Sequence, residues 1–152
     1  MEMKDEIRIE APRAHVYDAL NDPAVLKECI PGCEELVQHS DTELEAKVVL
    51  KIGPVKAKFG GQVVLDKTNA PEGFSLSGEG NGGVAGFAKG VADVELEADG
   101  DATVLRYTAK ADIGGKIAQL GSRLIASTAN RLAGQFSKKL EDAVEQEDAI
   151  AA

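Results

Sequence analysis

The chain of 152 residues has only two histidines and two cysteines, the side chains that often serve as catalytic bases and nucleophiles, and it has no tryptophan. His15 falls on a predicted short helix and His39 at a predicted strand end. No pattern brings the two histidines together, so we interpret neither as a catalytic base. Asp93, Glu95 and Glu97 share one face of a predicted strand, which we expect to be solvated. The sequence therefore shows no catalytic constellation.

The two cysteines, Cys29 and Cys33, lie in the segment CIPGC. A C-x-x-x-C spacing without further cysteine or a nearby histidine falls short of a zinc site, so we expect no metal. We interpret both as reduced, largely buried thiols in a reducing compartment, and Cys33 as the candidate for a reactive thiol.

Positive charge is scarce, because 17 Lys and Arg stand against 26 Asp and Glu, a formal net charge of -9. Nucleic acids and anionic membrane surfaces select for clustered Lys and Arg, so this balance disfavours both as partners. The longest stretch without a charged residue, Gly80 to Ala88, is far shorter than the roughly 20 apolar residues of a spanning helix. The N-terminal segment MEMKDEIRIE lacks the apolar run of a signal peptide. We expect a cytoplasmic protein with no transmembrane segment.

The chain does contain 43% apolar residues, enough for the core of one ordinary domain. We expect that domain to span residues 1–146 and a frayed tail to follow at 147–152. Alternation predicts a strand at 6–11, and helical spacing predicts a short helix after Pro12. A second short helix at 24–29 and a brief strand at 35–40 follow.

From Thr42 to Ile113 apolar residues alternate with polar ones at the period of two that is typical of strands. Gly53-Pro54, residues 69–73 and the Asp99 to Asp101 turn divide this region into consecutive antiparallel strands. After residue 115 the apolar period becomes that of one long amphipathic helix. These elements predict an α+β helix-grip fold, a curved seven-stranded antiparallel sheet wrapped on a long C-terminal helix, with two short helices after strand 1.

A glycine-rich run, GEGNGGVAGFAKG at 78–90, contains the G-x-G-x-x-G spacing of dinucleotide-binding loops. That spacing acts only after a parallel strand and before a helix, whereas here strands lie on both sides. We therefore interpret the run as a loop at the mouth of a cavity, with Val84 and Phe87 as an apolar lip.

The cavity is predicted from side-chain volume at the inward positions of the sheet. Several are small, namely Gly61, Gly78, Gly80, Gly90, Ala92, Ala109 and Ala111. We favour a dry, mostly apolar cavity over a filled core, with Tyr107 as a polar handle. The predicted lining is Phe59, Phe74, Leu76, Gly78, Gly80, Val84, Phe87, Tyr107, Leu120, Leu124 and Thr128.

Four lysines, Lys47, Lys51, Lys56 and Lys58, form a basic strip around the Gly53-Pro54 turn. We consider it a candidate docking patch, although a simply solvated strand face explains the same pattern.

Four segments together resemble a known family: IPGCEEL at 30–36, GPVKAKFGGQVVL at 53–65, LSGEGNGGVAGFAKGVADVEL at 76–96 and IGGKIAQLGSRLI at 113–125. They are similar to CoxG, the G subunit of carbon monoxide dehydrogenase, over about residues 3–145. The resemblance implies the START-like (SRPBCC) superfamily. It also implies a protein that accompanies a molybdenum hydroxylase, helps associate that enzyme with the cytoplasmic membrane and binds a lipophilic quinone, without an established catalytic set.

The leading hypothesis is a non-catalytic protein that binds a quinone or lipid-like molecule between sheet and helix, with no covalent or metal cofactor. Two alternatives stay open. One is a cyclase-like enzyme of the same fold, for which Tyr107 and Cys33 are the candidate groups. The other is a protein-interaction or assembly subunit with a filled core. The sequence ends at Ala152, without the C-terminal extension of some relatives, so we expect at most peripheral contact with the inner face of the membrane.

Overall fold

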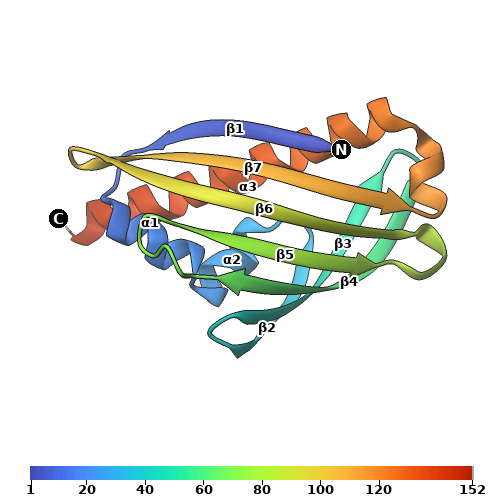
Figure 1. Cartoon of the computed structure of the whole chain (residues 1–152), viewed down its shortest axis with the longest axis horizontal. Helices are drawn as coiled ribbons and strands as arrows, with labels where there is room; N and C mark the ends of the chain where they lie inside the picture. Colours follow the sequence, from blue (N-terminus) through green and yellow to red (C-terminus); the bar gives the residue numbers. More distant parts are fainter. Residues whose placement is uncertain (152) are drawn as a thin grey trace.

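The computed structural model describes residues 1–151, with side chains from Met1 to Glu147. Figure 1 shows a sheet that curves around one long helix, with two short helices beside one end of it. The elements are β1 Glu2–Ile9, α1 Arg13–Leu20, α2 Pro23–Cys29, β2 Cys33–Ser40, β3 Glu43–Ile52, β4 Val55–Asp66, β5 Gly73–Asn81, the 3-10 helix η1 Gly83–Ala85, β6 Phe87–Asp99, β7 Ala102–Gly114, the 3-10 helix η2 Lys116–Leu120 and α3 Ser122–Ala151.

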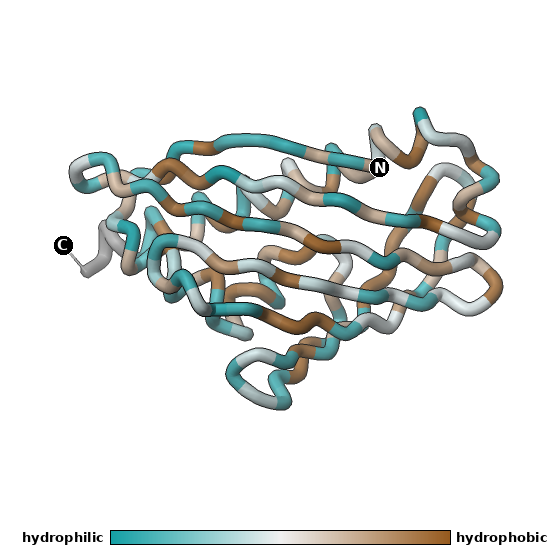
Figure 2. Tube along the Cα trace, viewed as in Figure 1, coloured by the Kyte–Doolittle hydropathy of each residue, from teal (hydrophilic) through white to brown (hydrophobic). Residues whose placement is uncertain are grey.

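The seven strands form one sheet in the order β1-β7-β6-β5-β4-β3-β2, and every neighbouring pair is antiparallel. Strands β2 to β7 lie side by side in the order in which they occur in the sequence. Strand β1 forms an edge of the sheet and pairs with β7. Hydrophobic and hydrophilic residues alternate along these strands (Figure 2), so one face is apolar. The predicted helix-grip fold is confirmed, including the two short helices after β1 and the long C-terminal helix.

The long helix begins later than its apolar spacing predicts. Ile117 and Leu120 belong to η2, and Gly121, with φ +94°, separates η2 from α3. The prediction of one continuous helix after residue 115 is therefore wrong at its start, because Gly121 adopts a positive φ that ends η2 before α3 begins. The predicted fraying at 147–152 falls mostly outside the described side chains, although the backbone of α3 is helical to Ala151.

The core consists of two separate hydrophobic clusters. The larger one lies where α1, α2 and the second half of α3 meet the sheet, and it includes the fully buried Ile9, Val16 and Leu140. The smaller one gathers Phe59 and Ile117 with η1 and the β3–β4 hairpin at the opposite end of the sheet; its remaining members are Ala85, Val48, Leu50, Ile52, Val55, Ala57, Ile113 and Leu120.

Candidate functional site

The middle of the inner sheet face, between the two clusters, carries the smallest side chains of the sheet. Neighbouring strands pair them in register: Gly61 with Gly80, Gly78 with Gly90, Gly90 with Ala111 and Ala92 with Ala109. All of these residues are only partly buried, and part of their exposed surface lies on the outer face, where Gly78, Gly90 and Ala111 line one groove and Gly61 and Gly80 another. A Cβ placed on Gly80 would have no neighbour closer than the Gly60 carbonyl oxygen at 4.0 Å. The sheet surface is therefore not closely covered here.

The corresponding stretch of α3 shows the same incomplete burial. Leu124, Ile125 and Leu132 are partly buried, although Thr128 between them is buried. Leu140 and Val144, one to two turns beyond Phe136, are buried in the larger cluster. Protein cores normally pack to the density of organic crystals. Partial exposure on both the sheet and the helix means that the first half of α3 does not pack tightly onto the small residues.

The large residues predicted to line the cavity lie at its two ends. Phe59 is buried in the smaller cluster and Leu120 packs against it. Phe74 is buried in the larger cluster, where its ring meets that of Tyr17 edge to face at 6.1 Å, and Leu76 packs beside it. These side chains belong to the two clusters that bound the small-residue region.

Two hydroxyl-bearing residues accompany the apolar ones. Tyr107 lies on an inward position of β7 and packs against the larger cluster; burial, with a smaller effect of Asp5, raises the pKa of its phenol above the ordinary value. Its hydroxyl is therefore protonated at neutral pH and can donate a hydrogen bond. Thr128, on α3, is also buried. At the opposite end of the small-residue region, Leu124 on α3 lies against Gly53 in the β3–β4 hairpin. A Cβ placed on Gly53 would be 2.8 Å from Leu124 Cδ2.

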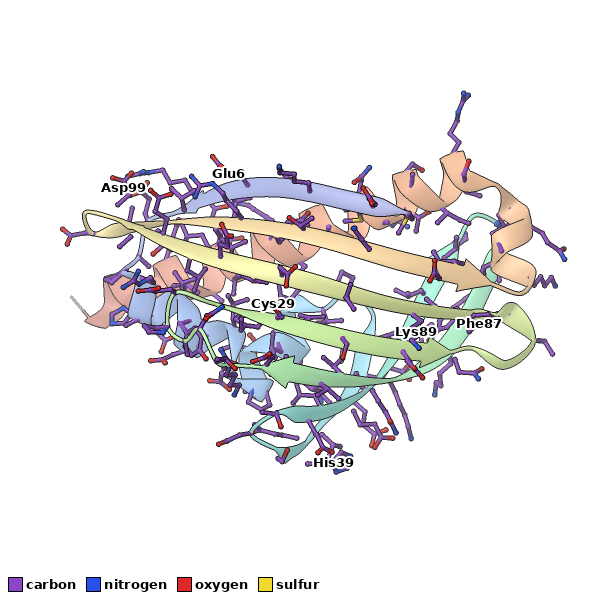
Figure 3. The ribbon with its side chains drawn as sticks, viewed as in Figure 1. Glu6, Cys29, His39, Phe87, Lys89 and Asp99 are labelled. Carbon is purple, nitrogen blue, oxygen red and sulfur yellow. The ribbon has the colours of Figure 1, made fainter. Side chains whose placement is uncertain are left out.

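The glycine-rich loop is a compact turn around η1. Its Ala85 is buried against Phe59, whereas Val84 at the tip is 93% exposed. Phe87 is the first residue of β6 and, like Lys89 two residues on, belongs to the outer face of the sheet (Figure 3). Its side chain is 51% exposed, and its ring lies over Gly114, where an added Cβ would be 2.3 Å from Cζ. The prediction that Val84 and Phe87 line the cavity is therefore wrong: Val84 projects into solvent at the tip of the turn, and Phe87 lies on the outer face of the sheet.

The two cysteines are free. Cys29 is buried, and burial followed by the charge of Glu28 raises the pKa of its thiol. Cys33 is partly buried and its thiol donates to the Glu35 carbonyl oxygen at 3.4 Å. Among residues 1–147, no three His, Cys, Asp or Glu side chains are grouped as metal ligands.

The four lysines of the basic strip divide into two kinds. Lys47 pairs with Glu35 at 3.3 Å and Lys58 with Glu34 at 3.1 Å. Lys51 and Lys56 face each other in register across the β3–β4 hairpin, and neither pairs with an acid in the described part of the chain.

One surface feature has only a weak sequence signal. The outer sheet face holds a broad groove of about 740 Å³ around Val64, Ser77 and Val91. Both valines are about half exposed. Val64 and Val91 occupy outward positions of their strands, where polar residues are more common. Two apolar residues at such positions are the sequence feature that indicates this groove.

The comparisons with known proteins agree with this architecture. The family model of CoxG, the G subunit of carbon monoxide dehydrogenase, matches residues 6–145. The chain belongs to this family. No curated protein matches the chain significantly. Family membership and the START-like fold support an accessory role in binding a hydrophobic ligand.

Solved structures of the same fold cover nearly the whole chain. A conserved protein from Geobacillus kaustophilus is 27% identical, with a TM-score of 0.90 and 96% of both chains covered. A START superfamily protein from Mycobacterium smegmatis is 14% identical, with a TM-score of 0.72 over 95% of this chain and 97% of that one. The Zhui aromatase/cyclase from Streptomyces sp. R1128 is 10% identical, with a TM-score of 0.72 over 96% and 94%.

Some proteins of this fold are enzymes, as the cyclase shows. None of the helices among the described residues has the length and apolar character needed to cross a bilayer.

Proposed function

We propose that this protein binds a quinone or another lipid-like molecule between the sheet and the first half of α3. We further propose that it serves a carbon monoxide dehydrogenase-type molybdenum hydroxylase and helps couple that enzyme to the membrane. The observation that carries the ligand proposal is the half-buried region of small residues between the two hydrophobic clusters. The partner and the membrane role are supported by family membership alone.

The chemistry of this region favours an apolar, flat or elongated ligand. Its surfaces are glycine, alanine and leucine, which offer carbon and backbone but no fixed charge, and burying apolar ligand surface there is favourable by about 25 cal/mol per Å². Tyr107 is a protonated donor at an inward position of β7, next to Ala109 and Ala111 on the same face, and a quinone carbonyl is a suitable acceptor. A ring with an apolar tail would satisfy both features.

Two other functions make different demands on the same region. A cyclase-like enzyme needs two titratable groups that converge on a substrate. Tyr107 pairs in register with Val94 on β6 and with Asp5, which is exposed on the edge strand β1. An assembly subunit needs no ligand and would gain stability from a filled interior.

The proposal is tested by measuring binding of decylubiquinone to the full chain, with native mass spectrometry of the purified protein to detect a retained ligand. Gly80→Leu places a large side chain at an inward position with free space. Gly60→Leu is the matched control, since Gly60 is exposed on the neighbouring strand and also has no atom within 4 Å of a built Cβ.

We expect Gly80→Leu to weaken decylubiquinone binding by at least tenfold without lowering the melting temperature, and Gly60→Leu to bind like the original chain. The absence of both a retained and an added hydrophobic ligand would refute the proposal. Equal weakening by the two variants would place the ligand elsewhere. Turnover of a ligand by the purified chain would favour the enzyme instead.

A further inference from the structure

We propose that the end of the molecule formed by the β3–β4 hairpin, η1 and η2 docks on an anionic lipid bilayer, with Val84 entering the lipid. This inference rests on the membrane role in the proposed function and assigns that role to a surface. We call this surface the basic end, defined by residues 51–58, 82–91 and 114–124.

The three segments meet although they are far apart in sequence. Gly53 in the hairpin touches Leu124 at the start of α3, and Gly86 packs against the Gly114 carbonyl and Ile117. Phe59, Ala85 and Ile117 form the buried cluster beneath them. The basic end is therefore one continuous surface, at the end of the sheet opposite α1 and α2 (Figure 1).

Charge is sorted toward this end. The three segments contain no Asp or Glu, and their cations are Lys51, Lys56, Lys58, Lys89, Lys116 and Arg123, all exposed. The acids beside them are fewer: Asp112 stands opposite Lys89 in register, and Glu34 and Glu79 pair with Lys58 and Lys89. The other end carries Asp99, Asp101 and the acidic second half of α3, and Figure 3 shows Asp99 and Glu6 far from Lys89. The formal charge of -9 hides this separation. A molecule charged in this way is oriented with its basic end toward an anionic surface.

Several of these cations have no acidic partner of their own. Lys58 and Lys89 pair with Glu34 and Glu79, but Lys51, Lys56 and Lys116 form no ion pair with any described residue. Lys51 and Lys56 are placed directly opposite each other, an arrangement that disfavours the hairpin. The hairpin thus keeps a local excess of positive charge despite its cost in stability.

Val84 supplies the apolar contact. It projects from a turn fixed by the buried Ala85, by a hydrogen bond from the Gly83 amide to the Asn81 side chain and by one from the Gly82 amide to the Gly86 carbonyl. A single projecting valine needs a matching pocket on a protein, but it needs none in a fluid bilayer. This favours lipid over an acidic protein surface. The smaller cluster, which closes this end of the interior, would then face the lipid.

Vesicle sedimentation tests the charge. We expect the full chain to bind phosphatidylcholine vesicles that contain phosphatidylglycerol, and to bind pure phosphatidylcholine much more weakly. At about 1 kcal/mol per Lys or Arg near an anionic surface, Lys56→Glu with Lys116→Glu should weaken binding by roughly 30-fold or more. Lys4→Glu with Lys27→Glu, which changes net charge equally at exposed positions elsewhere, should have little effect.

The apolar contact is tested by fluorescence, because the chain has no tryptophan. Val84→Trp should shift its emission to the blue on anionic vesicles and be quenched by brominated lipid, whereas Val37→Trp, on the edge strand β2, should not. Equal losses in the two double-lysine variants, or no shift at residue 84, would overturn the assignment. So would retention on polyglutamate but not on vesicles, which would indicate an acidic protein surface.

Decylubiquinone binding separates this proposal from the ligand proposal. A chain that binds decylubiquinone but not vesicles would refute the docking surface and leave the ligand site standing. A chain that binds vesicles through the basic end but does not bind decylubiquinone would support the docking surface and refute the ligand site.

Discussion

The Thr103 hydroxyl donates a hydrogen bond of 2.8 Å to the Ala11 carbonyl oxygen, and both residues are completely buried. Thr103 is on β7, near its start, and Ala11 lies in the link between β1 and α1. This bond fixes the point at which the chain leaves the edge strand and turns toward the short helices. The position of α1 over the larger cluster depends on that link.

Replacement of Thr103 by valine should lower the free energy of unfolding by about 1–3 kcal/mol, because the shape is kept while the buried Ala11 carbonyl loses its donor. Thr108→Val is the control, since Thr108 lies exposed on the same strand. Urea denaturation measures both. A Thr103→Val variant as stable as Thr108→Val would show that the bond contributes nothing.

Gly86→Ala should be strongly destabilising. Gly86 has φ +125°, and an added Cβ would lie 2.3 Å from the Gly114 carbonyl oxygen. Strained backbone costs about 1–3 kcal/mol, and the clash with backbone adds to it. Gly60→Ala has open space and should change the free energy of unfolding by no more than about 0.5 kcal/mol. Thermal unfolding compares the two, and similar melting temperatures would contradict the tight packing of η1 on η2.

Lys51→Glu should stabilise the protein by about 0.2–1 kcal/mol, because it replaces a like-charge pair with Lys56 by an opposite-charge pair. Lys51→Gln should give a smaller gain. The gain should shrink at high salt, where exposed charges are screened. A loss of stability in Lys51→Glu at low salt would show that the two lysines do not interact across the hairpin.

Both tyrosines should ionise above the ordinary tyrosine pKa. Burial is the main cause for each, with smaller effects of Asp18 on Tyr17 and Asp5 on Tyr107. Because the folded pKa is raised, the folded state holds these protons more tightly, so stability falls as the pH rises from the unfolded value, near 10, through the folded one. Phenolate absorbance against pH follows this directly, and Tyr17→Phe and Tyr107→Phe assign the two steps. Ordinary titration of both groups would contradict their burial.

The strands and their consecutive antiparallel order from β2 to β7 were predictable because period-two alternation is a local property of each strand and short turns join neighbours. The place of β1 beside β7 was not, because that pairing joins residues about 100 apart in the chain. The break at Gly121 was not, because Ile117 and Leu120 are spaced alike in a 3-10 turn and in an α-helix. Phe87 was misjudged for a related reason. Phe87 has the same parity as Lys89 and Val91, whose side chains lie on the outer face, but the glycine content of residues 78–90 favours a loop there, whereas β6 already begins at Phe87.

The basic end could not be predicted from net charge. Lys56, Lys89 and Lys116 follow one another at intervals of about thirty residues, and only the fold brings their segments together. The small-residue region was predicted from the parity of Gly78, Gly80 and Ala92, which the register confirms. Its occupant was not predictable, because glycine and alanine define room but not a partner.

The core is divided into two clusters of unequal size, and we expect them to unfold with unequal free energy. The larger cluster ties both short helices and the end of α3 to the sheet, whereas the smaller one is anchored by Phe59, Ala85 and Ile117. Amide protons at η2 and the β3–β4 hairpin should therefore exchange with solvent by local opening, while those around Ile9 and Leu105 should await global unfolding. A ligand would then enter the interior when the end that holds the smaller cluster opens locally, while the end that holds the larger cluster stays folded.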